Sequence, residues 1–171
     1  MTTKSRKRAL RIFDSPNSST PEVQLLSNGT YHVMVTSAGG GYSRWNSLTL
    51  IRWVEDAVCD NWGSFCYVRD VASREYWSIA YQPTLKRADV YESVFPDGSA
   101  VFRRRDLDIE TYTEIIVASE DDVEVRRTCI TNHSGARRMV EITSYAEIVL
   151  TSPAIDSTHL AILCCRRPRS G

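Results

Sequence analysis

Apolar and polar residues alternate with a period of two along most of this chain, which is the pattern of half-buried β-strands. Residues 31–36 (YHVMVT) are the clearest early example, because Tyr31 and the two valines share one face. The Asn28-Gly29 pair just before them is a tight-turn signal. His32 falls on the opposite face from the valines, so we expect a surface residue rather than a ligand.

The second half of the chain repeats this pattern more regularly. Ala72-Ser73-Arg74 and Pro96-Asp97-Gly98 each separate two β-rich runs, and each predicts a hairpin. Residues 108–118 predict a strand with the threonines and apolar residues at odd positions on one face. The last strand is expected to bury the face formed by Val140, Ile142, Ser144, Ala146, Ile148 and Leu150.

Turn signals recur at intervals near ten residues, and no convincing amphipathic helix is present. Roughly nine or ten strands at that spacing predict an all-β, antiparallel sandwich. Arg103, Arg104 and Arg105 resemble a basic patch. Because Asp106, Asp108 and Glu110 are as abundant nearby, a solvated cross-strand charge ladder explains the arginines better.

The pattern also divides the chain into three parts. Residues 1–20 are basic and then rich in Ser and Pro, which favours a flexible tail. Residues 21–152 form the expected sandwich domain. Residues 153–171 show neither the period-two pattern of a strand nor the periodicity of a helix, and they end in CCRRPRSG. We therefore expect an irregular tail. A chain that stops inside a larger protein, through truncation or a frameshift, would have such a tail.

Length and composition narrow the class of protein. The chain has 171 residues, which suits one domain, and its formal net charge of zero argues against a nucleic-acid partner. No apolar run is long enough to span a membrane, and the N-terminus lacks the apolar core of a signal peptide. We therefore expect a cytoplasmic chain without membrane contact. A parent enzyme held at the inner membrane would carry its anchor outside this segment.

The sequence offers little for catalysis or cofactors. Five cysteines are present without CxxC spacing, which favours reduced thiols over a disulfide framework or a zinc site. The three histidines are scattered and make no HExxH motif. No GxSxG motif supports a catalytic triad. We expect no metal, no cofactor and no catalytic residue in this chain.

The strongest candidate site is the stretch from Ser37 to Trp62, which carries a triple glycine followed by aromatic and arginine residues. An aromatic face beside a planar guanidinium suits a sugar ring, which has an apolar face and a rim of hydroxyls. The alternative is a glycine-rich β-turn with its aromatics in the core. We expect Trp53 and Trp77 to lie in the core, whereas Trp45 and Trp62 fit either interpretation. The candidate sugar-binding or interdomain residues are Gly39, Gly40, Gly41, Tyr42, Ser43, Arg44, Trp45, Arg52, Asp60, Asn61 and Trp62.

Several motifs resemble the N-terminal β-sandwich of glycoside hydrolase family 94, formerly glycosyltransferase family 36. The most specific is AGGGYSRW (38–45), followed by RW (52–53) and DNWG (60–63); YWSIAYQPT (76–84) and FRRRDLDIET (102–111) extend the likeness. The version here is nearer to the cyclic β-1,2-glucan synthase branch. The resemblance implies a galactose-mutarotase-like β-supersandwich, which in the family packs on an (α/α)6 barrel that carries the catalytic Asp.

The Gly-Asp-Trp-Asn-Asp-type motif of that barrel is missing from this chain, where Asp60-Asn61-Trp62 has a different order. The resemblance therefore implies a non-catalytic fragment that frames the sugar site and a subunit contact, and that is inactive alone. Its expected partners are a β-linked glucan or oligosaccharide, the missing barrel and a second copy in a homodimer. A free-standing carbohydrate-binding module and a structural or assembly domain are the alternatives.

Overall fold

The computed structural model describes residues 10–16, 22–53, 62–152 and 155, and these residues form thirteen β-strands. All strand pairs are antiparallel, which confirms the predicted all-β class. The strands are β1 (Arg11–Phe13), β2 (Val23–Ser27), β3 (Tyr31–Thr36), β4 (Gly41–Trp45), β5 (Leu48–Ile51), β6 (Ser64–Asp70), β7 (Tyr76–Ser78), β8 (Val90–Phe95), β9 (Ser99–Asp106), β10 (Ile109–Val117), β11 (Glu124–Asn132), β12 (Val140–Ala146) and β13 (Ile148–Thr151).

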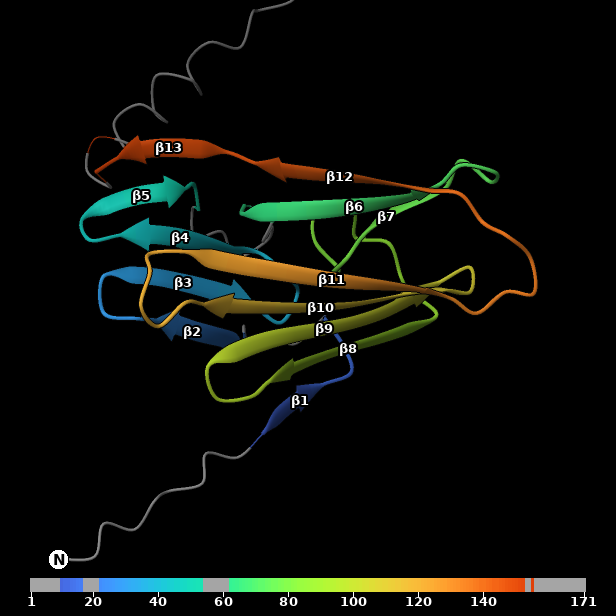
Figure 1. The fold of residues 1–171 in the computed structure, drawn as a ribbon, viewed down its shortest axis with the longest axis horizontal. Coiled ribbons are helices and arrows are strands. Elements are labelled where there is room, and N and C mark those ends of the chain that lie inside the picture. The colour runs from blue at the N-terminus through green and yellow to red at the C-terminus, as the bar shows by residue number, and fades with distance from the viewer. Residues whose placement is uncertain (1–9, 17–21, 54–61, 153–154, 156–171) are drawn as a thin grey trace, which may run out of the picture.

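The strands form two layers (Figure 1). The front sheet has the order β1-β8-β9-β10-β11. The rear layer consists of two sheets, one with the order β13-β5-β4-β3-β2 and the other with the order β12-β6-β7. The predicted hairpins at residues 72–74 and 96–98 are confirmed, because they join β6 to β7 and β8 to β9.

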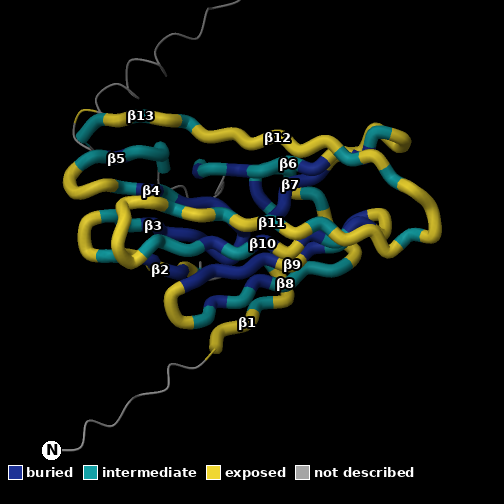
Figure 2. Tube along the Cα trace, in the orientation of Figure 1, coloured by how far each residue is buried: buried dark blue, intermediate teal, exposed yellow. Residues whose placement is uncertain are grey.

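The front sheet packs on both sheets of the rear layer. One core cluster joins Val33 and Val35 of β3 to Phe102 of β9 and Ile115 of β10. A second cluster joins Val68 and Trp77 of the three-stranded sheet to Ile109. Figure 2 shows this buried centre in dark blue, running through β3, β9 and β10. The predicted inward face of β10 is confirmed, since its odd positions from 109 to 115 are buried.

The prediction for the last strand was wrong. The expected strand is split into β12 and β13, and its apolar face is mostly open to solvent, with Ile142 58% and Ile148 67% exposed. The physical reason is that the front sheet ends at β11, so it does not reach over the strands at the far edge of the rear layer (Figure 1). An alternating sequence pattern predicts which face is apolar, but not where the opposing sheet stops.

Part of the expected N-terminal tail takes part in the fold. Residues 11–13 form β1, which pairs with β8 at the edge of the front sheet. Phe13 packs edge-on against Phe95 with 5.4 Å between the ring centroids, and the Arg11 guanidinium lies 5.3 Å from the same ring centroid of Phe95. The remaining described residues of this segment are Leu10 and residues 14–16.

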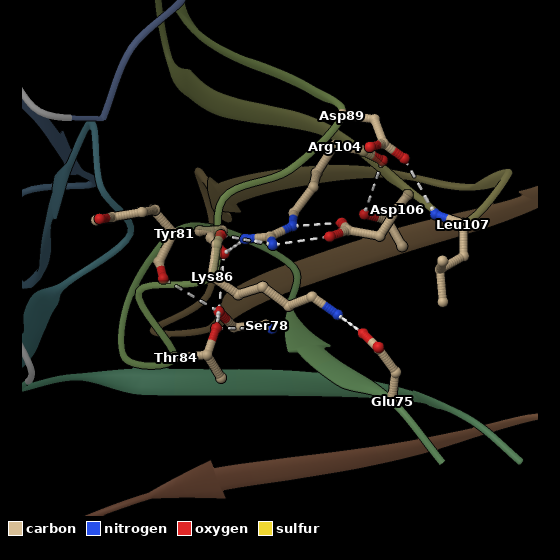
Figure 3. A network of polar contacts seen from close by, with 11 residues as sticks. Glu75, Ser78, Tyr81, Thr84, Lys86, Asp89, Arg104, Asp106 and Leu107 are labelled. Carbon is tan, nitrogen blue, oxygen red and sulfur yellow. Dashed lines mark hydrogen bonds and ion pairs between the residues drawn. The ribbon is translucent and has the colours of Figure 1, made fainter. Parts of the chain in front are cut away.

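The three consecutive arginines of β9 have different environments, which corrects the expectation of one solvated charge ladder. Arg103 is exposed and pairs with Glu110 across the strands, as a ladder requires. Arg104 is fully buried and binds both carboxylate oxygens of Asp106, at 2.6 and 3.0 Å. It also donates to the carbonyl oxygens of Ala80 and Lys86 (Figure 3).

This buried pair fixes the segment between β7 and β8. Besides the two carbonyl contacts of Arg104, Ser78 Oγ donates to the Ala80 carbonyl at 2.8 Å and lies 2.9 Å from Thr84 Oγ1. Lys86 reaches Glu75 in an ion pair on the surface (Figure 3). Each of the two buried charges is compensated by the other. Removing either Arg104 or Asp106 would therefore leave an unpaired buried charge and destabilise the fold.

Asp70 makes a second buried ion pair, at the end of β6. It accepts hydrogen bonds from the Arg138 guanidinium, with a shortest distance of 2.9 Å, and from the Ser73 backbone amide at 3.0 Å. The hydrogen bond from Arg138, followed by those from Ser73, holds the pKa of Asp70 well below its ordinary value of 3.8. The pair ties the β6–β7 hairpin to the segment that leads into β12.

Replacing Arg104 by Met is expected to lower the free energy of unfolding by about 3 kcal/mol or more, because Asp106 is left as an unpaired buried charge. Chemical denaturation measures this. The matched control, Arg103→Met, removes an exposed ion pair and is expected to cost about 1 kcal/mol or less. Equal losses for the two variants would contradict the assignment of Arg104 to the core.

Stability is expected to fall at acid pH in a way that depends on Asp70. Because its pKa is lowered in the folded state, its contribution is complete above the unfolded-state pKa and is lost as the pH falls toward the folded-state value. Denaturant unfolding of the wild type and of Asp70→Asn at neutral and acid pH measures the difference. The variant should lose less stability on acidification; an unchanged pH profile would refute the prediction.

Candidate functional site

The glycine run forms the turn from β3 into β4 and is buried. Thr36 closes this turn, because its amide donates to the Gly40 carbonyl at 2.8 Å and its hydroxyl accepts from the Gly40 amide at 3.0 Å. Gly39 has a φ of +97°, and a Cβ there would lie 2.3 Å from Ala80 Cβ. A Cβ on Gly41 would lie 1.9 Å from the Met34 carbonyl oxygen. Close packing therefore accounts for glycine at these two positions.

The turn is tied to the segment that precedes β6. The Gly41 amide donates to the Trp62 carbonyl oxygen at 2.9 Å. A Cβ on Gly63 would lie 3.0 Å from the backbone nitrogen and oxygen of Gly41. The structure thus brings Gly41 and Trp62 together, two of the residues singled out in the sequence. Asp60 and Asn61 lie outside the described residues.

Tyr42 and Arg44 project from the outer face of the rear layer, opposite the face that carries the core valines. The Arg44 guanidinium lies 4.3 Å from the centroid of the Tyr42 ring. Trp53 completes the group, with its ring centroid 5.9 Å from that of Tyr42. Among the described residues, Arg44 Nε is buried without a hydrogen-bond partner. The Tyr42–Arg44–Trp53 group is therefore an aromatic and guanidinium surface of the kind that suits a sugar ring.

Ser43 and Trp45 point the other way, because neighbouring residues of a strand face opposite sides. Ser43 Oγ donates to Glu124 Oε2 of β11 at 2.5 Å. The Trp45 indole donates to Asp122 Oδ2 at 2.6 Å. The structure therefore separates Arg44 from Trp45, although the two are adjacent in sequence. The proposed sugar contact of Trp45 stays a prediction, and its exposed fraction of 41% leaves ring surface accessible.

Asp122 forms hydrogen bonds with several segments at this end of the sandwich. Its carboxylate accepts hydrogen bonds from the hydroxyl of Thr30, the indole of Trp45 and the amide of Asn28. These bonds, that from Thr30 first, lower the pKa of Asp122 below its ordinary value. The charged carboxylate therefore joins the turn between β2 and β3, the end of β4 and the turn between β10 and β11.

Arg52 directly follows β5 and contacts Glu147, the residue between β12 and β13. It forms an ion pair with Glu147, and its amide donates to the Glu147 carbonyl at 3.0 Å. Glu147 also lines a cavity of about 210 Å³ together with Trp62, Gly63 and Tyr145. This cavity, called here the Trp62 pocket, is smaller than an ordinary ligand cleft, but it offers two aromatic side chains and a carboxylate.

Three residues of this region were not predicted as site residues from the sequence. Trp53 was assigned to the core, yet it is half-buried and contacts Tyr42; Trp77, assigned likewise, is fully buried, as expected. Tyr145 and Glu147 line the Trp62 pocket from β12 and from the residue that follows it. Glu147 falls on the polar face of the last alternating run, as Glu141 does, so the sequence carries no signal that marks it. No local sequence pattern predicts that Tyr145 would lie beside Trp62, about eighty positions earlier in the chain.

A larger hollow lies on the other side of the glycine turn. It has a volume of about 580 Å³ and polar walls, contributed by residues 14–16, Tyr81, residues 87–89 and Tyr91. The Tyr91 hydroxyl donates to the Ser37 carbonyl at 2.6 Å, and burial raises its pKa above the usual range. Tyr91 thereby contacts the glycine turn, and no sequence motif predicted this hollow.

The described residues contain no cluster of three or more His, Cys, Asp or Glu side chains that could hold a metal ion. In the same part of the chain, no helix has the length and apolar character needed to cross a membrane.

Gly41→Ala is expected to lower the free energy of unfolding by about 3 kcal/mol or more, because the new methyl group would overlap the Met34 carbonyl. Gly98→Ala is the matched control. Its φ is also positive, but nothing lies within 4 Å of the added Cβ, so the expected loss is about 1 kcal/mol. Urea denaturation compares the two, and a Gly41 variant no less stable than the Gly98 variant would contradict the packing argument.

Comparison with known proteins agrees with this architecture. The family model described as "Glycosyl hydrolase 94, supersandwich domain" matches residues 6–162. The cyclic beta-(1,2)-glucan synthase NdvB of Rhizobium meliloti (strain 1021) is 38% identical over 150 residues, which are 88% of this chain and 5% of NdvB. An N,N'-diacetylchitobiose phosphorylase of Vibrio proteolyticus is 26% identical over 86% of this chain and 19% of its own length. The chain thus spans a small part of these relatives, and it belongs to the glycosyl hydrolase 94 family through its supersandwich domain.

Proposed function

We propose that this chain serves as the non-catalytic sandwich domain of an enzyme that acts on β-linked glucans, and that it contacts the sugar. The proposal places the sugar contact on the outer face of the rear layer, at the Tyr42–Arg44–Trp53 group and the Trp62 pocket. The observation that carries it is the stacking of Arg44 on Tyr42, with Trp53 beside them. The names of the relatives support the substrate class, since they include a glucan synthase and a disaccharide phosphorylase.

A hydrogen bond and an ion pair connect the two parts of this surface. The amide of Gly41, which precedes Tyr42 in β4, donates to the Trp62 carbonyl oxygen. Arg52, which precedes Trp53, holds Glu147 at the rim of the Trp62 pocket. A sugar chain that lies across both parts would meet aromatic faces for stacking and a guanidinium for its hydroxyls. Because no carboxylate pair is assigned to acid and base roles here, the proposed contribution is binding and orientation alone.

The other expectations join this proposal. The outer face is where we place contact with a catalytic barrel, and we assign no reaction to the chain by itself. A cytoplasmic setting is supported by Cys66 and Cys129, which are free thiols. The alternative of a structural or assembly domain is favoured by a different observation, the uncovered face of β12 and β13.

Calorimetric titration with linear β-1,2-glucan oligosaccharides tests the sugar contact. We expect weak binding to the isolated chain, with a dissociation constant of about 1 mM, because one small open surface supplies few contacts. Tyr42→Ala and Arg44→Ala should each weaken binding about tenfold, which corresponds to about 1.4 kcal/mol. Tyr112→Ala, an exposed tyrosine on the front sheet, is the matched control and should bind as the wild type does.

The same titration with Trp45→Ala tests the contact predicted for that residue. A parallel titration with β-1,4-linked oligosaccharides tests the linkage. Binding that survives both the Tyr42 and the Arg44 substitution would overturn the assignment of the surface. If the isolated, folded chain fails to bind even at tens of millimolar sugar, a concentration well above the roughly 1 mM expected, the sugar contact is refuted and the structural alternative gains.

A further inference from the structure

The outer face of the three-stranded sheet carries one tyrosine on each of its strands. β12, β6 and β7 lie side by side (Figure 1), and they contribute Tyr145, Tyr67 and Tyr76 in that order. The residues that these strands give to the core are Val140, Val68 and Trp77. Each of them lies an odd number of positions from the tyrosine of its strand. Because successive side chains of a strand alternate between faces, all three tyrosines project from the outer face.

The three tyrosines lie on one diagonal across the sheet. Tyr145 pairs with Phe65 of β6, two positions before Tyr67. Tyr76 pairs with Arg69 of β6, two positions after Tyr67. Diagonal neighbours on one face of a sheet are about 8 Å apart, which aromatic side chains can bridge. The three side chains therefore form a continuous aromatic line, called here the tyrosine row.

The tyrosine row is accessible to solvent. Tyr145 is 51% exposed and Tyr76 is 61% exposed, while Tyr67 between them is half-buried. Burial, and then the proximity of Tyr145 and Tyr76, raises the pKa of the Tyr67 hydroxyl above its ordinary value. All three hydroxyls are therefore protonated at neutral pH, and each can donate a hydrogen bond.

The charges beside the tyrosine row are compensated within the chain. Arg69 donates to Glu141 at 3.0 Å, and these two are the charged side chains on the outward face of β12, β6 and β7. Thr143 lies directly beside Tyr67 and adds a hydroxyl. A surface of aromatic faces, hydroxyls and compensated charges suits a neutral sugar chain, because sugar rings stack on aromatic faces and sugar hydroxyls bind polar groups. It offers no net charge to an ionic partner.

The tyrosine row joins two hollows. The first is the Trp62 pocket, which Tyr145 lines. The second lies at the edge of β7, has a volume of about 340 Å³ and is lined by Tyr76. Its other lining residues are Arg74, Glu75, Thr84 and Lys86. The two diagonal steps between the hollows span about 16 Å, so a ligand that follows the row must be a chain of several sugar units.

We propose that the tyrosine row is a binding track for a neutral, unbranched oligosaccharide that extends from the Trp62 pocket toward β7. The track rests on the proposed function, since it prolongs the sugar contact beyond the Tyr42–Arg44–Trp53 group and the Trp62 pocket. Each tyrosine offers a ring face for stacking and a hydroxyl for a hydrogen bond. Every sugar unit that reaches the row therefore adds contacts, and the affinity rises with the length of the sugar chain.

Calorimetric titration of the 171-residue chain with linear β-1,2-glucan oligosaccharides of two lengths tests the track. Oligosaccharides of about ten units should bind roughly tenfold more tightly than those of about three, because the additional units reach the row as part of one ligand. Tyr67→Ala and Tyr76→Ala should each reduce this advantage to about twofold, with the affinity for the short oligosaccharide unchanged. Tyr76 is largely exposed, so its variant should fold, and circular dichroism checks both variants.

Tyr112→Ala is the matched control, since Tyr112 is an exposed tyrosine on the front sheet, and it should keep the full dependence on length. The comparison of variants separates stacking on the row from the larger number of binding registers that a long ligand offers. Equal affinities for the two lengths, or an advantage that survives both row substitutions, would overturn the track and leave the sugar contact at Tyr42 and Arg44 intact.

The converse result tests the proposed function separately. A length advantage that is lost in the Tyr67 and Tyr76 variants, together with binding that survives Tyr42→Ala and Arg44→Ala, would support the track and overturn the site assigned to the Tyr42–Arg44–Trp53 group. Failure of the folded chain to bind either length would refute both.

Discussion

The close approach of Gly41 to β3 is the constraint on which the candidate site depends. A side chain at this position would collide with the Met34 carbonyl, so β3 and β4 can pair in this register only with glycine there. The same residue holds the Trp62 carbonyl through its amide. One residue therefore positions both the strand that carries Tyr42 and Arg44 and the segment that contributes Trp62 to the Trp62 pocket.

The buried Arg104–Asp106 pair has a similar role on the other side of the glycine turn. It holds the carbonyls of Ala80 and Lys86, and the Ala80 side chain fills the space that a Cβ on Gly39 would need. The amides of Tyr81 and Gln82 both donate to the Ala38 carbonyl. The turn is thus clamped between the segment after β7 and the segment before β6. A rigid turn of this kind can present the outer residues of β4 in one fixed arrangement, which lowers the entropic cost of binding.

Much of the fold could be predicted from the sequence, because period-two patterns and turn residues are local signals. They gave the hairpins at residues 72–74 and 96–98 and the buried face of β10. The environment of Arg104 could not be predicted, since three adjacent arginines look alike until the opposing layer is in place. The exposure of Ile148 depended on where the front sheet ends, which is a property of the whole sandwich.

The candidate site was predicted in part. The glycine turn and Trp62 do lie together, as the sequence predicted. The other residues that line the Trp62 pocket, Tyr145 and Glu147, come from a later part of the chain. The opposite directions of Arg44 and Trp45 follow from strand periodicity and could have been foreseen. The family was recognisable from specific motifs, whereas the assignment of each side chain to one face required the strand register.

Sugar binding to the outer face of the rear layer can be measured directly, because the chain contains four tryptophans. Indole N–H resonances can be followed by nitrogen–proton correlation spectra while a β-1,2-glucan oligosaccharide is added. We expect the signals of Trp53 and Trp62 to shift with a common affinity, while that of the fully buried Trp77 stays in place. Shifts of Trp77 alone, or no shift at Trp53 and Trp62 when the sugar is in excess, would contradict it.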